Sequence, residues 1–414
     1  MRTDKSSGKV KKQAGDLMLG LIGLGVMNAV MSLVINPYIS HNYGAEFHGR
    51  ILYYTSLAAL MAATFGNGAN YGRLKIYNDE RSTENGEYNI FLLISGVILA
   101  AVTFGFLILK NMDTAGSSYI GLFALIFLTT LRYYGDVQYR MDLDYKRFAV
   151  YYFSIALGYL AGMFLFRFTK SWVLIMIIGE LFGLLYVGIT GTIFKKPYFK
   201  VTPSFGKHMR VLFVLSLSFL LSDFVGSADR LLLPLLLANG NELSAIYYYA
   251  SLVGKMMSLL SAPLNGVLSG YLYNSEGEIK QNQFLKEVFL MLGIFVLVTA
   301  FSVGGSHLFV WLFYRDYYLA ARPLFLIANA GQVIFFICNT MMVVVLRYTD
   351  EKVQMAVSGI YVVLFLAATI PLTLTYGVFG MAWGILIVNL VKFILYAVMG
   401  YLSIRKKQSK GANA

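Results

Sequence analysis

Apolar runs of 18 or more residues recur along the whole chain and constrain its fold more than any other feature of the sequence. Each run is long enough to cross about 30 Å of hydrocarbon as a helix that rises about 1.5 Å per residue. The alternating pattern of membrane β-barrel strands is absent from the sequence. We therefore predict an all-α polytopic membrane protein with twelve transmembrane helices, at 17–39, 51–70, 88–109, 117–136, 148–168, 171–193, 211–237, 244–272, 284–313, 321–346, 353–376 and 379–403.

The composition agrees with this interpretation. The chain is 58% hydrophobic and only 13% charged, whereas a soluble domain is about 25% charged. The connections between the runs are too short to hold a soluble domain, so the function must be carried out in the membrane or at its faces. The one cysteine, Cys338, lies in an apolar run, which excludes an internal disulfide and favours a core position. We predict no cofactor and no metal site.

The basic residues predict the orientation of the chain. Most of the 34 Lys and Arg residues fall in the termini and in loops that alternate to one side of the predicted membrane. By the positive-inside rule, both termini are predicted to be cytoplasmic. We also expect the membrane to be the plasma membrane of a bacterium or archaeon. The net charge of +13 then reflects topology and anionic lipid, and no nucleic-acid partner is expected. The opposite loops carry Arg50, Lys110, Arg167, Lys170, Arg315 and Arg322.

A basic connection, KKPYFKVTPSFGKHMR at 195–210, divides the predicted helices into two sets of six. Similar residues recur at equivalent places in the two sets, among them Gly44 with Gly240 and Glu46 with Glu242. Six spans return the chain to its starting side, so the sets are expected to be parallel lobes around a central cavity. The predicted division is an N-terminal lobe (1–194), a cytoplasmic linker (195–210), a C-terminal lobe (211–404) and a basic cytoplasmic tail (405–414).

Six ionisable residues lie inside the predicted spans. A charge at bilayer depth costs about 2.5 to 3.5 kcal/mol on the insertion scale, so such groups face a partner or a cavity. The functional interpretation is a cationic cavity for an anionic group, with the acids binding or releasing a coupling cation. The structural alternatives are an internal ion pair of Arg230 with an aspartate, lysines that reach the interface, and an acid that accepts hydrogen bonds. The residues are Glu180, Asp223, Asp229, Arg230, Lys255 and Lys392, the last of which shares a helix face with Asn389 and Tyr396.

Five local motifs carry a resemblance to a known family. They are PYISHNYGAEFHG (37–49), FGNGANYGR (65–73), ADRLLLPLLLANGNELSAIYYYA (228–250), FYRDYYLAARPLF (313–325) and YGVFGMAW (376–383). In this order, over essentially the whole length, the chain resembles the polysaccharide transporter branch of the multidrug/oligosaccharidyl-lipid/polysaccharide (MOP) flippase superfamily, which includes the O-antigen and capsule flippases.

This resemblance implies a function and a set of partners. It implies a lipid-linked oligosaccharide, usually on undecaprenyl pyrophosphate, that moves from the cytoplasmic to the outer leaflet by alternating access. It also implies coupling to a proton or Na⁺ gradient, and polysaccharide polymerase and export proteins as partners besides membrane lipids. The implied substrate-binding residues are Arg230, Lys255, Lys392, Arg73 and Asn389, and the ion-coupling candidates are Asp223, Asp229 and Glu180.

Two other classes compete with a flippase. A multidrug-type cation antiporter of the same superfamily predicts an acidic cavity, which Asp223, Asp229 and Glu180 would supply. A membrane-embedded polymerase or glycosyltransferase needs sugar-binding acids or arginines in a sizeable loop. The outer loops here are short, and the sequence contains no DxD pair, phosphate-binding glycine loop or metal-binding histidine pattern. We therefore do not expect an enzyme.

Overall fold

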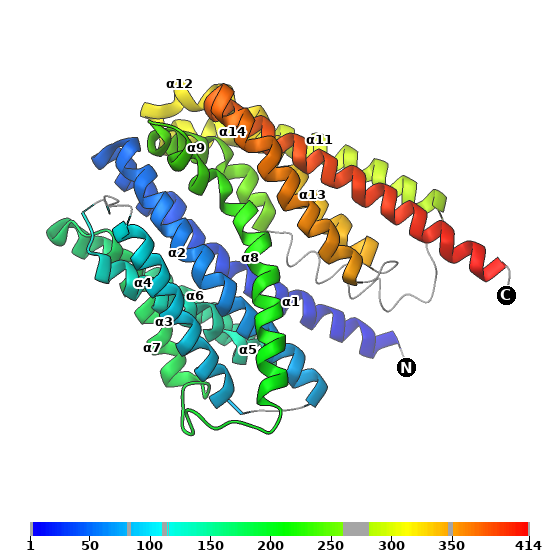
Figure 1. Ribbon diagram of the computed structural model, residues 1–414, viewed down its shortest axis with the longest axis horizontal. Helices are drawn as coiled ribbons and strands as arrows, with labels where there is room; N and C mark the ends of the chain where they lie inside the picture. Colours follow the sequence, from blue (N-terminus) through cyan, green and yellow to red (C-terminus); the bar gives the residue numbers. More distant parts are fainter. Residues whose placement is uncertain are drawn as a thin grey trace. The chain divides into compact units, whose positions relative to one another are not determined.

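The computed structural model describes residues 3–80, 84–109, 114, 116–259, 281–346 and 351–412. Within these ranges every regular element is a helix (Figure 1). The chain forms two compact units, of which unit 1 comprises Met1–Tyr43 and Arg50–Ser227 and unit 2 comprises Gly44–Gly49 and Ala228–Ala414. The unit boundary at Ser227 lies inside a helix, and the linker proposed at 195–210 stays a prediction.

In the described residues, eight helices are long and apolar enough to cross a membrane, or nine if the two parts of α8 (Phe205–Leu236) count as one span. This count is below twelve because Met18–Tyr77 and Val357–Lys406 each hold two predicted spans, and because the eighth predicted span extends beyond the described residues. Within them, α2 (Asn36–Glu80) and α14 (Glu351–Ala412) each contain two helices that meet at one glycine. Gly44 has φ 84° and Gly377 has φ 59°, a region of backbone conformation that glycine enters without steric cost. Gly377 lies between the predicted spans 353–376 and 379–403.

The helices of unit 1 pack closely where their side chains are small. A Cβ atom on Gly158 would lie 2.7 Å from the Cα of Gly179, so the facing helices α6 and α7 approach through glycines, as is common in membranes. Besides parts of α2 and α8, unit 1 contains α1 (Thr3–Ala29), the π-helix η1 (Val30–Ile35), α3 (Gly86–Leu109), α4 (Tyr119–Gly135), α5 (Val137–Met141), α6 (Tyr145–Thr169) and α7 (Val173–Thr190).

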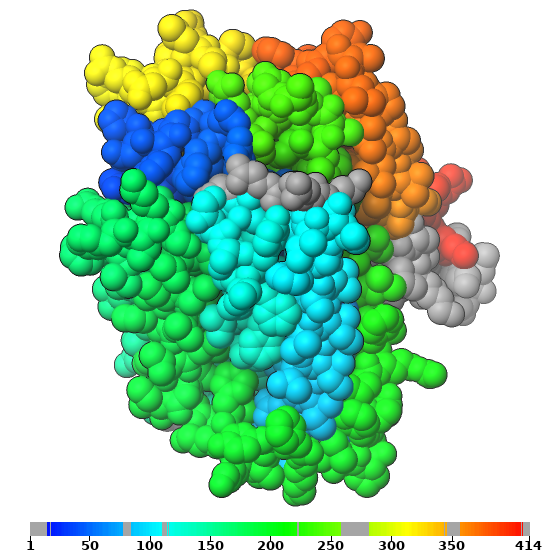
Figure 2. Space-filling model, turned by 60° about the vertical axis from the view of Figure 1, so that its left-hand side comes forward, coloured from blue at the N-terminus to red at the C-terminus, as the bar shows by residue number. Residues whose placement is uncertain are grey.

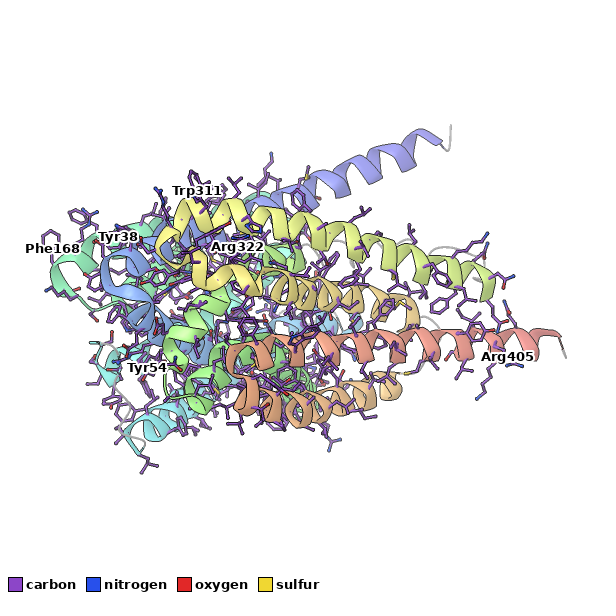
Figure 3. All side chains as sticks on the ribbon, turned by 90° about the horizontal axis from the view of Figure 1, so that it is seen from above. Tyr38, Tyr54, Phe168, Trp311, Arg322 and Arg405 are labelled. Atoms are coloured by element: carbon purple, nitrogen blue, oxygen red, sulfur yellow. The ribbon has the colours of Figure 1, made fainter. Side chains whose placement is uncertain are left out.

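Unit 2 has an apolar core between α11, α13 and α14. Cys338 is a free thiol in this core, as predicted, and it packs with Phe284, Ile334 and Phe393. Trp311 and Arg322 lie at one end of these helices and Arg405 at the other (Figure 3). The unit contains α9 (Gly240–Leu259), α11 (Gln281–Phe313), η2 (Arg315–Tyr317), α12 (Tyr318–Ala321), η3 (Arg322–Leu324) and α13 (Phe325–Leu346), with α14 and parts of α2 and α8.

Several prolines lie inside or beside the long helices. Next to Pro37 the chain contains the π-helix η1, whose wider turns end at Ile35, and such turns accommodate a proline that cannot donate a backbone hydrogen bond. Pro234 and Pro371 lie inside α8 and α14. Pro263, and the part of the eighth predicted span beyond Leu259, lie outside the described residues.

Candidate functional site

One buried acid of unit 2 contacts two basic side chains. Asp229 on α8 is 2% exposed, and one of its carboxylate oxygens accepts a hydrogen bond from the ammonium of Lys255 on α9. The other oxygen lies 3.9 Å from Nε of Arg230. Asp229 therefore pairs more closely with Lys255, from the next helix, than with its neighbour in sequence.

The described ion pairs of this cluster join two basic side chains to one acid. Ammonium and guanidinium groups donate charge-assisted hydrogen bonds. An anionic group with several acceptor oxygens, such as a phosphate, would accept such bonds from both basic groups. The cluster therefore has the chemistry of an anion-binding site.

A second basic group of unit 2 is surrounded by aromatic rings. Lys392 on α14 is only 7% exposed, and its Nζ lies 4.1 Å from the ring centroid of Tyr361, 5.2 Å from that of Phe335 and 5.9 Å from that of Tyr396. Ring faces attract a cation through their quadrupole and lower the cost of its burial. Among the described residues, the contacts found for this ammonium are with rings and not with a carboxylate.

Asn389, one turn before Lys392, fixes the nearest of these rings. Its Oδ1 accepts a 2.6 Å hydrogen bond from the hydroxyl of Tyr361, and its Nδ2 donates to the carbonyl of Gly331 at 3.1 Å. Both ends of the buried amide are thus engaged within the protein. In this arrangement Asn389 positions the ring that Lys392 contacts, and the substrate contact of Asn389 stays a prediction.

The acid predicted in the sixth span forms an ion pair in unit 1. Glu180 on α7 is 2% exposed, and its Oε2 lies 2.7 Å from Nε of Arg132 on α4. The hydroxyl of Thr129 donates to Oε1 at 3.2 Å. Sequence reasoning assigned Arg132 to a basic loop, whereas the structure buries it inside the unit. Glu180 therefore has a basic partner that its position in the sequence did not indicate.

A second buried acid of unit 1, Asp136, was not among the predicted site residues. Asp136 is 1% exposed and accepts hydrogen bonds from Asn70 at 2.6 Å, Arg140 at 2.8 Å and the hydroxyl of Tyr152 at 2.8 Å. It was missed because it is the last residue of the predicted span 117–136, and only charges well inside the spans were taken as candidates. A signal existed in the pairing of Asp136 with Arg140 four residues later, the spacing of one helical turn.

Arg73, the predicted entry residue for a headgroup, is 4% exposed in unit 1. Its guanidinium donates to the hydroxyl of Tyr134 and, at 2.5 Å, to Oδ1 of Asn85. The ring centroid of Tyr88 lies 5.0 Å from its Cζ. These contacts hold Arg73 inside the unit, so contact with a substrate would require them to change.

Asp223 lies on α8 in unit 1, whereas Asp229 and Arg230 of the same helix belong to unit 2. The buried Oδ2 of Asp223 makes no hydrogen bond with the described residues. The structure thus brings together Asp229, Arg230 and Lys255, and it separately brings together Lys392 and Asn389. Arg73, Glu180 and Asp223 lie in unit 1. The contacts described for Arg73 and Glu180 are with different residues. Within the part of the chain that the structure describes, no group of three acidic, histidine or cysteine residues could hold a metal ion.

Similar folds occur among solved transport proteins. A point mutant of the Vibrio cholerae MATE transporter VcmN matches with a TM-score of 0.66 at 13% identity over 99% of each chain. The lipid II flippase MurJ in an inward closed conformation matches with a TM-score of 0.67 at 14% identity, over 95% of this chain and 90% of that one. An inward-facing multidrug resistance MATE transporter of the MOP superfamily matches with a TM-score of 0.61 at 16% identity, over 95% and 96%.

No protein-family model matches the sequence, and no curated protein matches it either. The structural matches are long but low in identity, so they define the fold. The protein has the all-helical transporter fold of the MATE proteins and MurJ, which confirms the predicted fold class. These matched structures are transporters and a flippase rather than enzymes. Together with the long apolar helices of the described residues, this fold makes the chain a multi-pass membrane protein.

Proposed function

We propose that the protein is a flippase that moves a polyprenyl-pyrophosphate-linked oligosaccharide from the cytoplasmic to the outer leaflet by alternating access, for export of a surface polysaccharide. The observation that carries this proposal is the grouping of basic side chains on the helices of the described part of unit 2. There, Lys255 and Arg230 share Asp229, and Lys392 faces aromatic rings. A pyrophosphate supplies the negative charge and the acceptor oxygens that these groups would bind.

The similarity to MurJ supports a lipid-linked substrate, because that protein is a flippase of lipid II. The motifs that resemble the polysaccharide transporters support an oligosaccharide of the O-antigen or capsule type. Under this proposal both termini are cytoplasmic in the cell membrane, and the polymerase and export proteins of the same pathway are partners. A proton or Na⁺ gradient drives the cycle, with Asp223, Asp229 and Glu180 as the coupling candidates.

A multidrug-type cation antiporter is the second candidate. It is favoured by the MATE transporters among the matched structures and by the buried acids Asp229 and Glu180. The described contacts weigh against it, because both acids already pair with basic side chains. An antiporter would have to bind its cationic substrate at one of these two acids or at Asp223, whose Oδ2 makes no hydrogen bond with the described residues.

The proposal is tested by complementing a deletion strain. The deletion should accumulate lipid-linked repeat units on the cytoplasmic leaflet, and the wild-type gene should restore export. We expect Lys255→Ala and Lys392→Ala to abolish glycan export, Lys392→Ala at normal membrane levels of protein because Lys392 has rings and no acid among its described contacts. Lys75→Ala, a change of an exposed lysine, should export normally. Normal export by both site variants would contradict the cationic site. Loss of cationic dye efflux with intact glycan export would favour the antiporter.

A further inference from the structure

The loop between α7 and α8 presents apolar and basic side chains together. Tyr198, Phe199 and Val201 are 45%, 60% and 48% exposed, and Lys195 and Lys196 just before them are exposed as well. Figure 2 shows this part of unit 1 protruding in green at the bottom of the view. Three large apolar side chains in so short a stretch are unfavourable in water. These side chains therefore favour contact with a membrane or another apolar surface over contact with water.

The backbone of this loop is fixed by buried groups of α3, so the exposed side chains are presented in a defined place. The carbonyl of Tyr198 accepts a 3.0 Å hydrogen bond from Nδ2 of Asn89. The amide and hydroxyl of Thr202 donate to Oε1 of Glu87 at 2.6 Å and 2.5 Å. A Cβ on Gly86 would lie 2.1 Å from the carbonyl oxygen of Lys200, so only glycine lets the two segments come this close.

The charge of the loop indicates what covers it. The ammonium of Lys200 contacts Glu84 at 2.5 Å, whereas Lys195 and Lys196 have no ion pair among the described residues. Because the loop joins two membrane-spanning helices, it lies at a membrane face, where aromatic side chains favour the headgroup level and lysines attract anionic lipids. If the loop faced water, exposure of the Phe199 ring would be unfavourable.

We propose that loop 191–204 is a lipid-binding surface, in which Tyr198, Phe199 and Val201 enter the bilayer interface and Lys195 and Lys196 bind anionic phospholipid headgroups. The ligand is the anionic phospholipid of the surrounding membrane. This surface belongs to unit 1, and it is separate from the basic residues of unit 2 to which the transported lipid is assigned. Lipid binding by this loop and transport of a lipid-linked substrate can therefore be tested independently of each other.

The test places a reporter in the loop. Phe199→Trp is reconstituted in nanodiscs of phosphatidylcholine that contain an equal fraction of either brominated phosphatidylcholine or brominated phosphatidylglycerol. Quenching in excess of the wild-type protein, which has 3 tryptophans, reports contact of residue 199 with lipid. We expect quenching by both lipids, and roughly twofold to fivefold stronger quenching by the anionic one, as attraction to two interfacial lysines implies.

Two charge variants in the same reporter chain complete the design. Lys195→Gln/Lys196→Gln should make the two lipids quench equally, whereas the matched control Lys75→Gln/Lys146→Gln, which changes exposed lysines elsewhere in unit 1, should keep the preference. Absence of quenching by either lipid would show that water or another protein covers the loop, and it would overturn the proposal. Equal quenching in the unmodified reporter would overturn the headgroup assignment. All variants change exposed side chains, and equal melting temperatures verify their folding.

Discussion

The two units of the molecule treat buried charge differently. In unit 1 the buried acids Glu180, Asp136 and Glu87 contact Arg132, Arg140 and His208, at 2.7 Å, 2.8 Å and 2.5 Å. Asp223, whose Oδ2 has no hydrogen bond with the described residues, is an exception near the unit boundary. In unit 2, by contrast, one acid, Asp229, forms ion pairs with both Lys255 and Arg230. Aromatic rings surround Lys392.

This difference separates charges that organise packing from charges that are available for binding. A matched pair with its remaining hydrogen bonds satisfied fixes two helices against each other. Basic groups inside membrane spans are unfavourable for insertion, and they commonly mark a substrate or ion path. The comparison therefore assigns a structural role to the pairs of unit 1 and supports substrate binding in unit 2.

The largest effect is expected from removing the shared acid of unit 2. Asp229→Asn leaves Lys255 and Arg230 without their carboxylate, and loss of one partner of a buried ion pair costs about 3–5 kcal/mol. The free energy of unfolding, measured by titration with SDS in detergent micelles, should fall by this amount. Asp229→Asn/Lys255→Met should recover most of the loss because it also removes the unpaired ammonium. Equal losses in the single and double variants would contradict the pairing.

A smaller loss is expected in unit 1 from Glu180→Gln. Glu180→Gln leaves one basic group, Arg132, without its carboxylate, whereas Asp229→Asn leaves two, so the expected loss lies at the lower end of the range for a broken buried ion pair, about 3 kcal/mol. The same SDS titration measures it, and Thr129→Val, which removes only the 3.2 Å hydrogen bond to Glu180, is the milder control. Unchanged stability of Glu180→Gln would argue against a structural pair and in favour of ion coupling at Glu180.

Lys392→Met should have the opposite effect on stability. It removes a buried charge for which the described residues provide rings but no acid, so the free energy of unfolding should stay constant or rise by about 1 kcal/mol. Glycan export should nevertheless fall at least tenfold in the complementation assay, because the proposed anion contact is gone. Phe335→Leu removes one ring and keeps the charge, and it should export better than Lys392→Met. Destabilisation by Lys392→Met with normal export would assign Lys392 to packing.

The sequence was sufficient for the parts of the fold that depend on local composition. Apolar length located the spans, and Gly377 lies between two predicted spans because only a short turn separates two long apolar runs. The period of a helix also placed Lys392, Asn389 and Tyr396 on one face, and the structure confirms that Lys392 lies near Tyr396.

Partners from distant helices could not be predicted in this way. Lys255 pairs with Asp229 from the preceding helix, but the sequence offered Arg230 as an equally good partner. Arg132 was counted with a loop, although Glu180 lies across from it in the packed unit. The pairing of buried charges depends on which helix faces touch, and a periodic pattern gives the face of one helix without its neighbour.

The smallest effect is expected where unit 1 carries an ion pair at its surface. Lys200 and Glu84 are in contact at 2.5 Å, but their side chains are 59% and 29% exposed, and exposed pairs contribute about 0–1 kcal/mol. Lys200→Gln should therefore leave the unfolding free energy almost unchanged. Thr202→Val, in the same loop, removes a hydroxyl that donates to the buried Glu87 and should cost about 0.5–1.5 kcal/mol. A larger loss in Lys200→Gln than in Thr202→Val would mean that the exposed pair fixes the loop, and the contrast between buried and surface charge would then fail within unit 1 itself.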